Sequence, residues 1–234
     1  MTRTGIVFLA SAAEDGGEES SGRRAYRLES LFRELNRELS HRLRAGFQLR
    51  KRTREFGAIL KRGRGAGAVL LRVWTELHPV TTRVVFVPGP VRVQTDLWSG
   101  GSGATAAPAS LHQFAGPPLE RAESLLESLT DSPSLLAADL DDRRSADQLR
   151  HLGSLLHLRL TGWTPRQLET YLAYRRLGSQ SRTAMQLDVT QPTVSETLSR
   201  IDARATTEAL AFFTDELDRA LEEATTRVGE GEAL

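Results

Sequence analysis

Cysteine is absent from this 234-residue sequence. Its absence excludes a disulfide framework, thiolate catalysis and any zinc site built on thiolates. The sequence also lacks an apolar run close to the roughly 20 residues that a membrane-spanning helix requires. We therefore expect a cytoplasmic protein with no membrane partner.

Aromatic residues are scarce, at 6%, and the formal net charge is only +1. With 39% hydrophobic and 26% charged residues, the composition predicts a soluble globular protein, and the length fits two domains better than one. Charge is unevenly distributed. Between residues 41 and 64 nine cations accompany one acid, Glu55, whereas from Glu208 onward eight acids accompany two arginines. The basic run could bind phosphates, or it could pair with the acidic tail.

The first apolar run, from Ile6 to Leu9, has two interpretations. Its β-favouring residues are typical of a buried strand. A short signal peptide is the alternative, because one arginine precedes about eight apolar residues and small residues follow them. We favour the strand, since the run is at the short limit for a signal.

Signatures of catalysis are missing. The five histidines are scattered, and the six-residue spacing of His151 and His157 does not place two ligands on adjacent turns of one helix face. A small acidic cluster, Asp139, Asp141 and Asp142, lies in a polar stretch that we interpret as a solvated loop. The glycine-rich stretch from Ser99 to Pro108 has no phosphate-loop pattern. We expect no catalytic residue, no metal and no cofactor.

The N-terminal half alternates between strand and helix patterns. After the first strand we predict a loop over Ala12–Gly22 and then a helix that ends at Gly46 and carries Leu28, Leu31, Phe32, Leu35, Leu39 and Leu43. Strands Phe47–Thr53 and Glu55–Leu60 and a helix Ala66–Leu77 follow. The last predicted elements are strands Thr82–Val87 and Val91–Leu97, around Pro88-Gly89-Pro90, and a helix Pro117–Leu129. This order predicts an α+β domain in which helices cover an antiparallel sheet.

The C-terminal half is predicted to be helical. The expected helices are Leu149–Leu160, Thr164–Arg176, the pair described next, and Ala203–Arg227. We place the α+β domain at residues 1–130, a linker at 131–147, an all-α helix-turn-helix domain at 148–205 and an amphipathic helix with an acidic tail at 206–234. The stripe on that last helix, formed by Ala209, Phe212, Phe213, Leu217, Ala220 and Leu221, is typical of a core or a dimer interface.

The segment from Ser181 to Ile201 has the pattern of a helix-turn-helix. Ala184 is small enough for the point where two helices cross. An apolar seam accompanies it, consisting of Leu187, Val189, Val194, Leu198 and Ile201. Thr190 can cap a second helix that begins near Gln191, with proline in its first turn. Asp188 occupies the turn position where glycine is usual, and aspartate tolerates the left-handed conformation that this turn needs.

The second helix of this pair is a candidate recognition helix. Its outward side chains can hydrogen-bond to base edges and phosphates in a major groove. We predict base contacts by Gln191, Thr193, Ser195 and Glu196, and phosphate contacts by Arg182, Ser199, Arg200 and Arg204. The alternative is a helical hairpin that only packs against its own domain.

The sequence Gly162-Trp163-Thr164-Pro165-Arg166-Gln167-Leu168-Glu169, followed by the unit from Ala184 to Leu198, resembles the SatD family. Softer likenesses are Leu77-His78-Pro79 and the stretch from Ala115 to Ala122. The resemblance implies an N-terminal domain similar to class III nucleotide cyclases and GGDEF proteins, with a ferredoxin-like antiparallel sheet, followed by a helix-turn-helix.

This sequence departs from the family where related cyclases hold catalytic metals. Members carry an aspartate at the end of the first strand, where this chain has Ser11 or a neighbour. Members also carry Gly-Asp-Glu-Phe in the first hairpin, where this chain has Thr53-Arg54-Glu55-Phe56. Because a guanidinium repels a cation, two-metal phosphoryl chemistry should be absent. The resemblance thus implies an inactive domain that serves as a sensor or dimerisation unit.

The sequence therefore predicts a homodimeric, sequence-specific protein that binds double-stranded DNA, a transcriptional regulator with a nucleotide as a candidate effector. Two alternatives stay open. A nucleotide-processing enzyme would require Asp15, Glu55 and another acid around one cavity. A protein-interaction module in stress or defence is favoured by the nearly neutral recognition helix, whose charges are Arg200 and Glu196.

Overall fold

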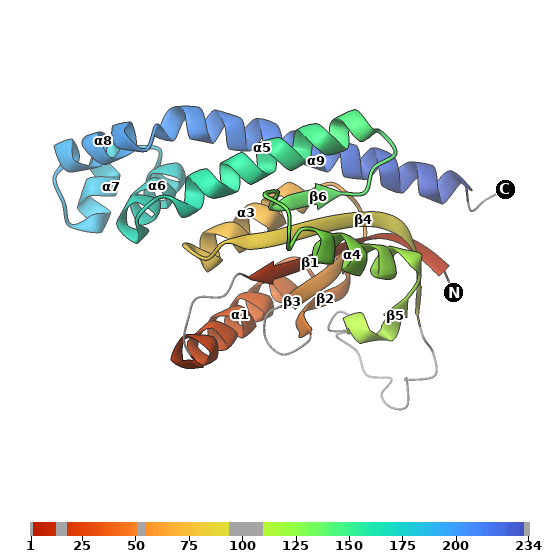
Figure 1. Ribbon diagram of the computed structural model, residues 1–234. Helices are drawn as coiled ribbons and strands as arrows, with labels where there is room; N and C mark the ends of the chain where they lie inside the picture. Colours follow the sequence, from red (N-terminus) through yellow and green to blue (C-terminus); the bar gives the residue numbers. More distant parts are fainter. Residues whose placement is uncertain (1, 13–17, 51–54, 94–109, 232–234) are drawn as a thin grey trace.

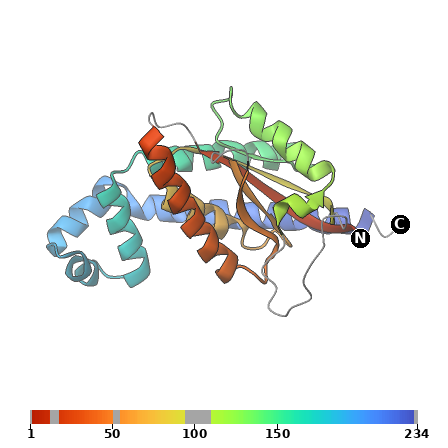
Figure 2. The same ribbon diagram turned by 90° about the horizontal axis from the view of Figure 1, so that it is seen from below.

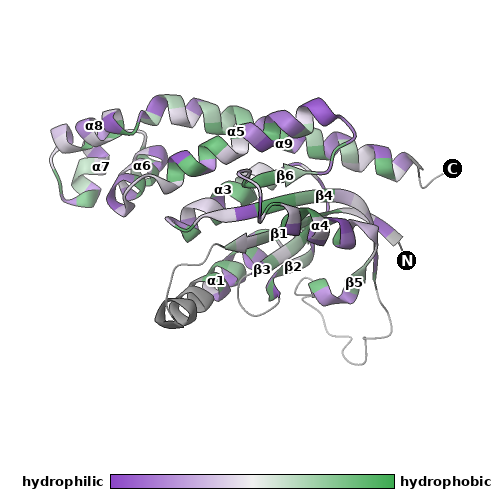
Figure 3. Ribbon diagram, viewed as in Figure 1, coloured by the Kyte–Doolittle hydropathy of each residue, from purple (hydrophilic) through white to green (hydrophobic). Residues whose placement is uncertain are grey.

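The first apolar run forms a central strand of a sheet. In the computed structural model, which describes residues 2–12, 18–50, 55–93 and 110–231, β1 (Thr2–Ala12) lies between β3 (Glu55–Leu60) and β4 (Thr82–Val93) (Figure 1). Every side chain from Ile6 to Leu9 is buried, because helices cover both faces of the sheet. The predicted buried strand is confirmed, and hydropathy marks the middle of the sheet as mostly apolar (Figure 3).

The sheet has six strands in the described residues, and it is mixed. Its order is β2-β3-β1-β4-β5, where β2 is Leu43–Arg50 and β5 is Phe114–Ala115. All of these neighbours are antiparallel, as predicted. The exception is β6 (Leu136–Ala138), which pairs parallel to β4. The prediction of a purely antiparallel sheet was therefore wrong. The chain returns to β4 through a helical crossover, which is the connection that parallel pairing needs.

The first helix differs from the prediction at both ends. Helix α1 (Glu18–Glu38) begins inside the segment predicted as a loop, and Leu43 begins β2 instead of extending the helix. Gly46 lies within β2 and ends no helix. Leu43 lies four residues after Leu39, so it fitted the helical spacing. The β2–β3 hairpin is confirmed, and its predicted turn lies outside the described residues.

Strand β4 runs straight through Pro88-Gly89-Pro90, where two strands were predicted. On its far side, β6 pairs with residues 84–86 and β5 pairs with residues 92–93, so the prolines lie at an edge. A strand tolerates proline where its missing N–H needs no partner. At Gly89, a Cβ would lie 2.4 Å from Pro118 of α4 (Pro117–Ser128), so glycine permits the close packing of that helix. Positions 94–97 of the predicted second strand lie outside the described residues.

The two faces of the sheet carry different helices. Ile6, Phe8 and Ala10 belong to a core shared with α1 and α3 (Ala66–Leu77), whereas Val7 and Leu9 pack with α4 and the short helix η2 (Leu111–Gln113). This division follows from the alternation of side chains along a strand. The helix predicted at 66–77 is confirmed with the same bounds, and α4 ends one residue before its prediction.

Five helices complete the chain: α5 (Arg143–Thr161), α6 (Pro165–Leu177), α7 (Gln180–Leu187), α8 (Gln191–Arg200) and α9 (Ala203–Gly231). The three short helices α6, α7 and α8 lie together at one end of the molecule, and α5 and α9 run side by side from them over the sheet (Figures 1 and 2). The segment predicted as a linker contains β6 and the start of α5, with Asp142 as its N-cap.

One apolar core joins the sheet to the helices. It extends from β1 through α3 and α5 to α9. At its centre the Trp74 ring of α3 stacks on His157 of α5, with centroids 4.7 Å apart, and on Phe213 of α9, with centroids 6.0 Å apart. The C-terminal stripe predicted as core or interface therefore divides, since Phe213 is fully buried whereas Phe212 is 61% exposed.

Helix α9 also binds the start of α3 through backbone amides. The Asp218 carboxylate accepts hydrogen bonds from the N–H groups of Gly65 and Gly67, at 2.5 and 2.7 Å. Glu222 accepts from the N–H groups of Gly63 and Arg64. Burial raises the pKa of Asp218, although these amide hydrogen bonds oppose the shift. The acidic tail thus contacts the basic run through peptide N–H groups at these positions.

Candidate nucleic-acid interface

Each helix of the α6–α8 unit begins at a capping hydroxyl. The Thr164 hydroxyl accepts from the Gln167 N–H at 3.2 Å, and the Gln167 side chain accepts in return from the Thr164 N–H at 2.8 Å. Ser179 caps α7, and Thr190 caps α8 by accepting from the Thr193 N–H at 3.3 Å. These caps satisfy amides that a helix start leaves unpaired, so the sequence itself fixes where α6, α7 and α8 begin.

The turn between α7 and α8 depends on Asp188. This residue has φ 53° and ψ 51°, in the left-handed region that aspartate tolerates better than most residues. The next N–H, that of Val189, donates to the Ala184 carbonyl at 3.0 Å and closes the end of α7. The turn conformation predicted at this position is confirmed.

Apolar contacts between the helices follow the predicted seam. Ala184, Val194, Leu198 and Ile201 are all buried, with Val194 only 1% exposed. Leu187 and Val189 are half-buried. Small Ala184 is buried in α7, and α7 and α8 contact each other and α6. The packed side of α8 is thereby defined, and its opposite side faces solvent.

The predicted contact residues are mostly on that solvent side. Seven of the eight are exposed, namely Arg182, Gln191, Thr193, Glu196, Ser199, Arg200 and Arg204. Ser195 is half-buried. Together with Ser199 and Arg204 it lines a groove of about 530 Å³ between α8, the end of α6 and the start of α9. The structure therefore brings these three together beside the groove, while Glu196 and Arg200 pair with each other one helical turn apart.

The cations of this surface differ in how they are engaged. Arg200 forms an ion pair with Glu196 at 2.6 Å, and Arg204 pairs with Glu208 at 3.0 Å. Such exposed pairs stabilise a fold by about 0–1 kcal/mol, so a phosphate can displace the carboxylate at small cost. In the stretch from α5 to α9, which is described in full, no ion pair joins Arg182 to a carboxylate. The exposed Arg182 guanidinium therefore has no carboxylate in that stretch that a bound anion would have to displace.

Two further arginines, which were not among the predicted contact residues, lie at this surface. Arg175 lies with its guanidinium 5.9 Å from the centre of the Tyr171 ring and lines the same groove, and exposed Arg176 follows it at the end of α6. Both belong to the helix predicted at Thr164–Arg176, to which we assigned no contact residue. The two arginines lie in the last turn of α6, before Leu177 and the C-cap Gly178, but only the fold brings this helix end beside α8.

The sheet region of the chain was expected to lack a metal site. Ser11 and Glu55 are direct neighbours in the register of β1 and β3, so the two landmark positions do come together. Arg54 and Asp15 lie outside the described residues. Among the residues that the structure describes, no group of three or more His, Asp or Glu side chains could hold a metal ion.

No family model matches this chain, and neither a curated protein nor a solved structure matches it. In the described part of the chain, no helix is both long and apolar enough to cross a bilayer.

Proposed function

We propose that this protein binds DNA in a sequence-specific way and regulates transcription, with α8 as its recognition helix. The observation that carries the proposal is the α7–turn–α8 geometry. Ala184 is buried between the helices, Asp188 adopts the left-handed turn, and α8 presents short polar side chains outward. A helix-turn-helix places such a helix in the major groove with its first residues against base edges.

For the N-terminal domain we propose a sensor or dimerisation role without catalysis. The order β1-α1-β2-β3-α3-β4, with β1 between β3 and β4, supports a ferredoxin-like arrangement. A single carboxylate, Glu55, stands opposite Ser11, whereas two-metal chemistry needs several. Incubating the protein with nucleoside triphosphates and magnesium or manganese should give no cyclic product. Synthesis of a cyclic nucleotide or dinucleotide would refute this part of the proposal.

A protein-interaction module is the second candidate function. One observation favours it: Met185 on α7 is 85% exposed, and Leu172 on α6 is 41% exposed, so apolar side chains accompany the polar ones on this unit. The Glu196–Arg200 pair also makes the face of α8 nearly neutral.

A salt titration separates the two candidates. Binding to duplex DNA should weaken steeply as salt rises, because each phosphate contact releases condensed counterions. About four arginine contacts, from Arg182, Arg200, Arg204 and Arg176, would give a slope of log K against log salt of about −3.6. A flat response, or no binding at low salt, would leave the interaction module as the better account.

Two variants divide phosphate contacts from base contacts. Arg200→Ala should weaken binding to specific and random duplexes alike and reduce the salt slope by about 1. Gln191→Ala should cost about 1–3 kcal/mol on the preferred sequence and little on random DNA. Fluorescence anisotropy on both duplexes at several salt concentrations measures the difference.

The matched control is Arg227→Ala. Arg227 is an exposed arginine that also has a partner at i−4, Glu223, and it lies near the far end of α9. Its replacement should leave both affinities unchanged. If Arg200→Ala and Gln191→Ala cause the same loss on specific and random DNA, the division of roles along α8 is wrong.

A further inference from the structure

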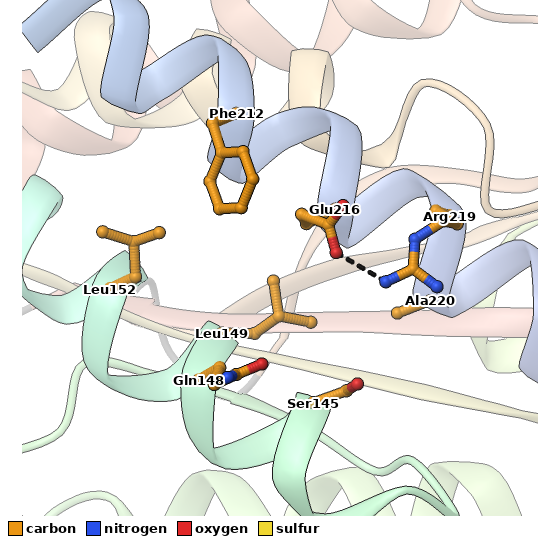
Figure 4. A pocket seen from close by; sticks show the side chains of 8 residues that line it. All are labelled: Ser145, Gln148, Leu149, Leu152, Phe212, Glu216, Arg219 and Ala220. Carbon is orange, nitrogen blue, oxygen red and sulfur yellow. Dashed lines mark hydrogen bonds and ion pairs between the residues drawn. The ribbon is translucent and has the colours of Figure 1, made fainter.

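An apolar groove follows the outer side of α5 and α9, away from the sheet. It has a volume of about 280 Å³; its apolar lining is Leu149, Leu152, Phe212 and Ala220, and its polar lining is Ser145, Gln148, Glu216 and Arg219 (Figure 4). Phe212 stands at its edge and is 61% exposed. Leu155, one turn beyond Leu152 on α5, is 65% exposed. Neighbouring exposed apolar side chains of this size mark an interaction surface.

Groove and protruding ring lie in the same patch, which is what a twofold interface requires. In such an interface one surface meets itself, so every knob needs a hole within the same surface. A cavity of about 150 Å³ lined by aliphatic side chains is enough to bind benzene, so the groove has room for a phenyl ring. We propose that a second copy of this chain docks here, with Phe212 of each protomer in the groove of its partner.

Charge fixes the orientation of the two copies. The outer stripe of α5 that runs through Gln148, Leu152 and Leu155 carries Arg144 and Arg159. Asp147 beside this stripe pairs with Arg150, and Arg159 pairs with Asp202 of its own chain. On α9 the stripe through Phe212 carries four glutamates and one arginine, namely Glu208, Glu216, Glu223, Glu230 and Arg219, and Arg219 pairs with Glu216 and Glu223 within the chain. A twofold axis parallel to the helices lays α5 of one protomer across α9 of the other and opposes unlike charges. An axis perpendicular to the helices would oppose α5 to α5, where like charges repel.

This pairing would fix the separation of the two recognition helices. Only Ile201 and Asp202 separate the end of α8 from the start of α9, and the Arg159 guanidinium ties this corner to α5 through Asp202 at 2.5 Å. Two docked α9 helices therefore hold two α8 helices at one spacing, as a palindromic operator requires. This consequence rests on the proposed function, whereas the docking itself does not.

Sedimentation velocity of the full chain tests the docking. The wild type should be a dimer at micromolar concentration. Phe212→Glu should raise the dissociation constant of the dimer at least about 30-fold, as expected for an aromatic anchor at the centre of an interface. The matched control is Met185→Glu, which places the same charge on an even more exposed apolar residue of α7 and should leave the dimer intact. Circular dichroism should be unchanged in both variants.

A charge exchange tests the orientation. One variant carries Arg144→Glu and Gln148→Glu on α5, and the other carries Glu216→Lys and Glu223→Lys on α9. Each alone should sediment as a monomer, since its own α5 and α9 now repel across the axis. A one-to-one mixture should restore a dimer, because the two reversed surfaces attract each other.

Two results would overturn the proposal: a wild type that is monomeric throughout, or a dimer that Phe212→Glu leaves intact. If Phe212→Glu abolishes the dimer but the wild-type dimer binds no duplex, the proposed function is refuted and the docking surface is supported. If the α5 variant and the α9 variant each form a dimer on their own, the proposed orientation is wrong.

Discussion

Replacing Phe213 with alanine is expected to lower the free energy of unfolding by about 3–5 kcal/mol. The ring is fully buried and lies nearly parallel to Trp74, with an angle of 10° between the planes. Gly153 of α5 packs against its other side, where a Cβ would lie 2.9 Å from the Phe213 Cζ. Because α3 and α5 both contact this ring of α9, neither can move inward to fill the space without losing other contacts.

Phe212→Ala is the matched control, because the adjacent ring is exposed. Its effect on the free energy of unfolding should stay within about 0.5 kcal/mol when measured at a concentration where the chain is monomeric. Urea unfolding followed by tryptophan fluorescence and by circular dichroism measures both variants. The two signals should coincide, since one core joins the sheet to the helices. Equal losses for the two variants, or a Phe213→Ala loss below about 1 kcal/mol, would contradict this description of the core.

Apart from α1, the helices could be predicted well because their signals are local. Thr164-Pro165 marks the start of α6, and Thr190 with Pro192 marks that of α8; the cap and the proline act within one turn of the helix that they begin. Helix α3 likewise ends at Leu77, directly before His78-Pro79, because the residue before a proline disfavours the helical conformation. At these places the sequence and the fold agree because no distant contact is involved.

Elements that depend on distant partners could not be predicted. Strand β6 is three residues long and exists only because β4 lies beside it. The prolines of β4 are tolerated because the edge beside them is unpaired, which no local pattern reveals. The contact of Asp218 with Gly65 joins residues 153 positions apart. In each case the deciding interaction comes from another part of the chain.

The candidate interface was predictable in its composition but not in its shape. Spacing along α8 placed Glu196, Ser199 and Arg200 on the solvent side, where they lie. The hydrophobic periodicity of one helix does not show which other helices pack beside it. The groove that half-buried Ser195 lines was therefore not predicted. Arg175 was missed for the same reason, since only the folded arrangement brings the end of α6 next to α8.

Acid should destabilise the protein through His157. This ring is fully buried in α5, and its Nε2 accepts a hydrogen bond from the backbone N–H of Thr82 at 2.8 Å, so the ring is neutral in the fold. Burial, together with the smaller effect of the neighbouring His78 charge, lowers the pKa of His157 from 6.5 to about 4. A proton on Nε2 would remove the acceptor that holds the start of β4 against α5.

The direction of the pH effect follows from these two pKa values. Above pH 6.5 His157 is neutral in both the folded and the unfolded chain and contributes no pH dependence. Between 6.5 and about 4 the unfolded chain takes up a proton that the folded chain refuses. The free energy of unfolding should therefore fall by about 1.4 kcal/mol per pH unit over this window, by about 3 kcal/mol in total. Below pH 4 both states are protonated, so this contribution becomes constant.

Urea unfolding from pH 7 to pH 4 measures this dependence, with His157→Gln and His151→Gln as the variants. Glutamine at 157 keeps an acceptor for the Thr82 N–H but cannot titrate. Between pH 7 and pH 4 the free energy of unfolding of this variant should therefore fall by about 3 kcal/mol less than that of the wild type. His151 is exposed on the same helix, and its replacement should leave the wild-type slope unchanged. Carboxylates such as Asp218, whose raised pKa gives the opposite slope, are common to all three chains and cancel in the comparison. Parallel curves for wild type and His157→Gln would mean that another group causes the acid sensitivity.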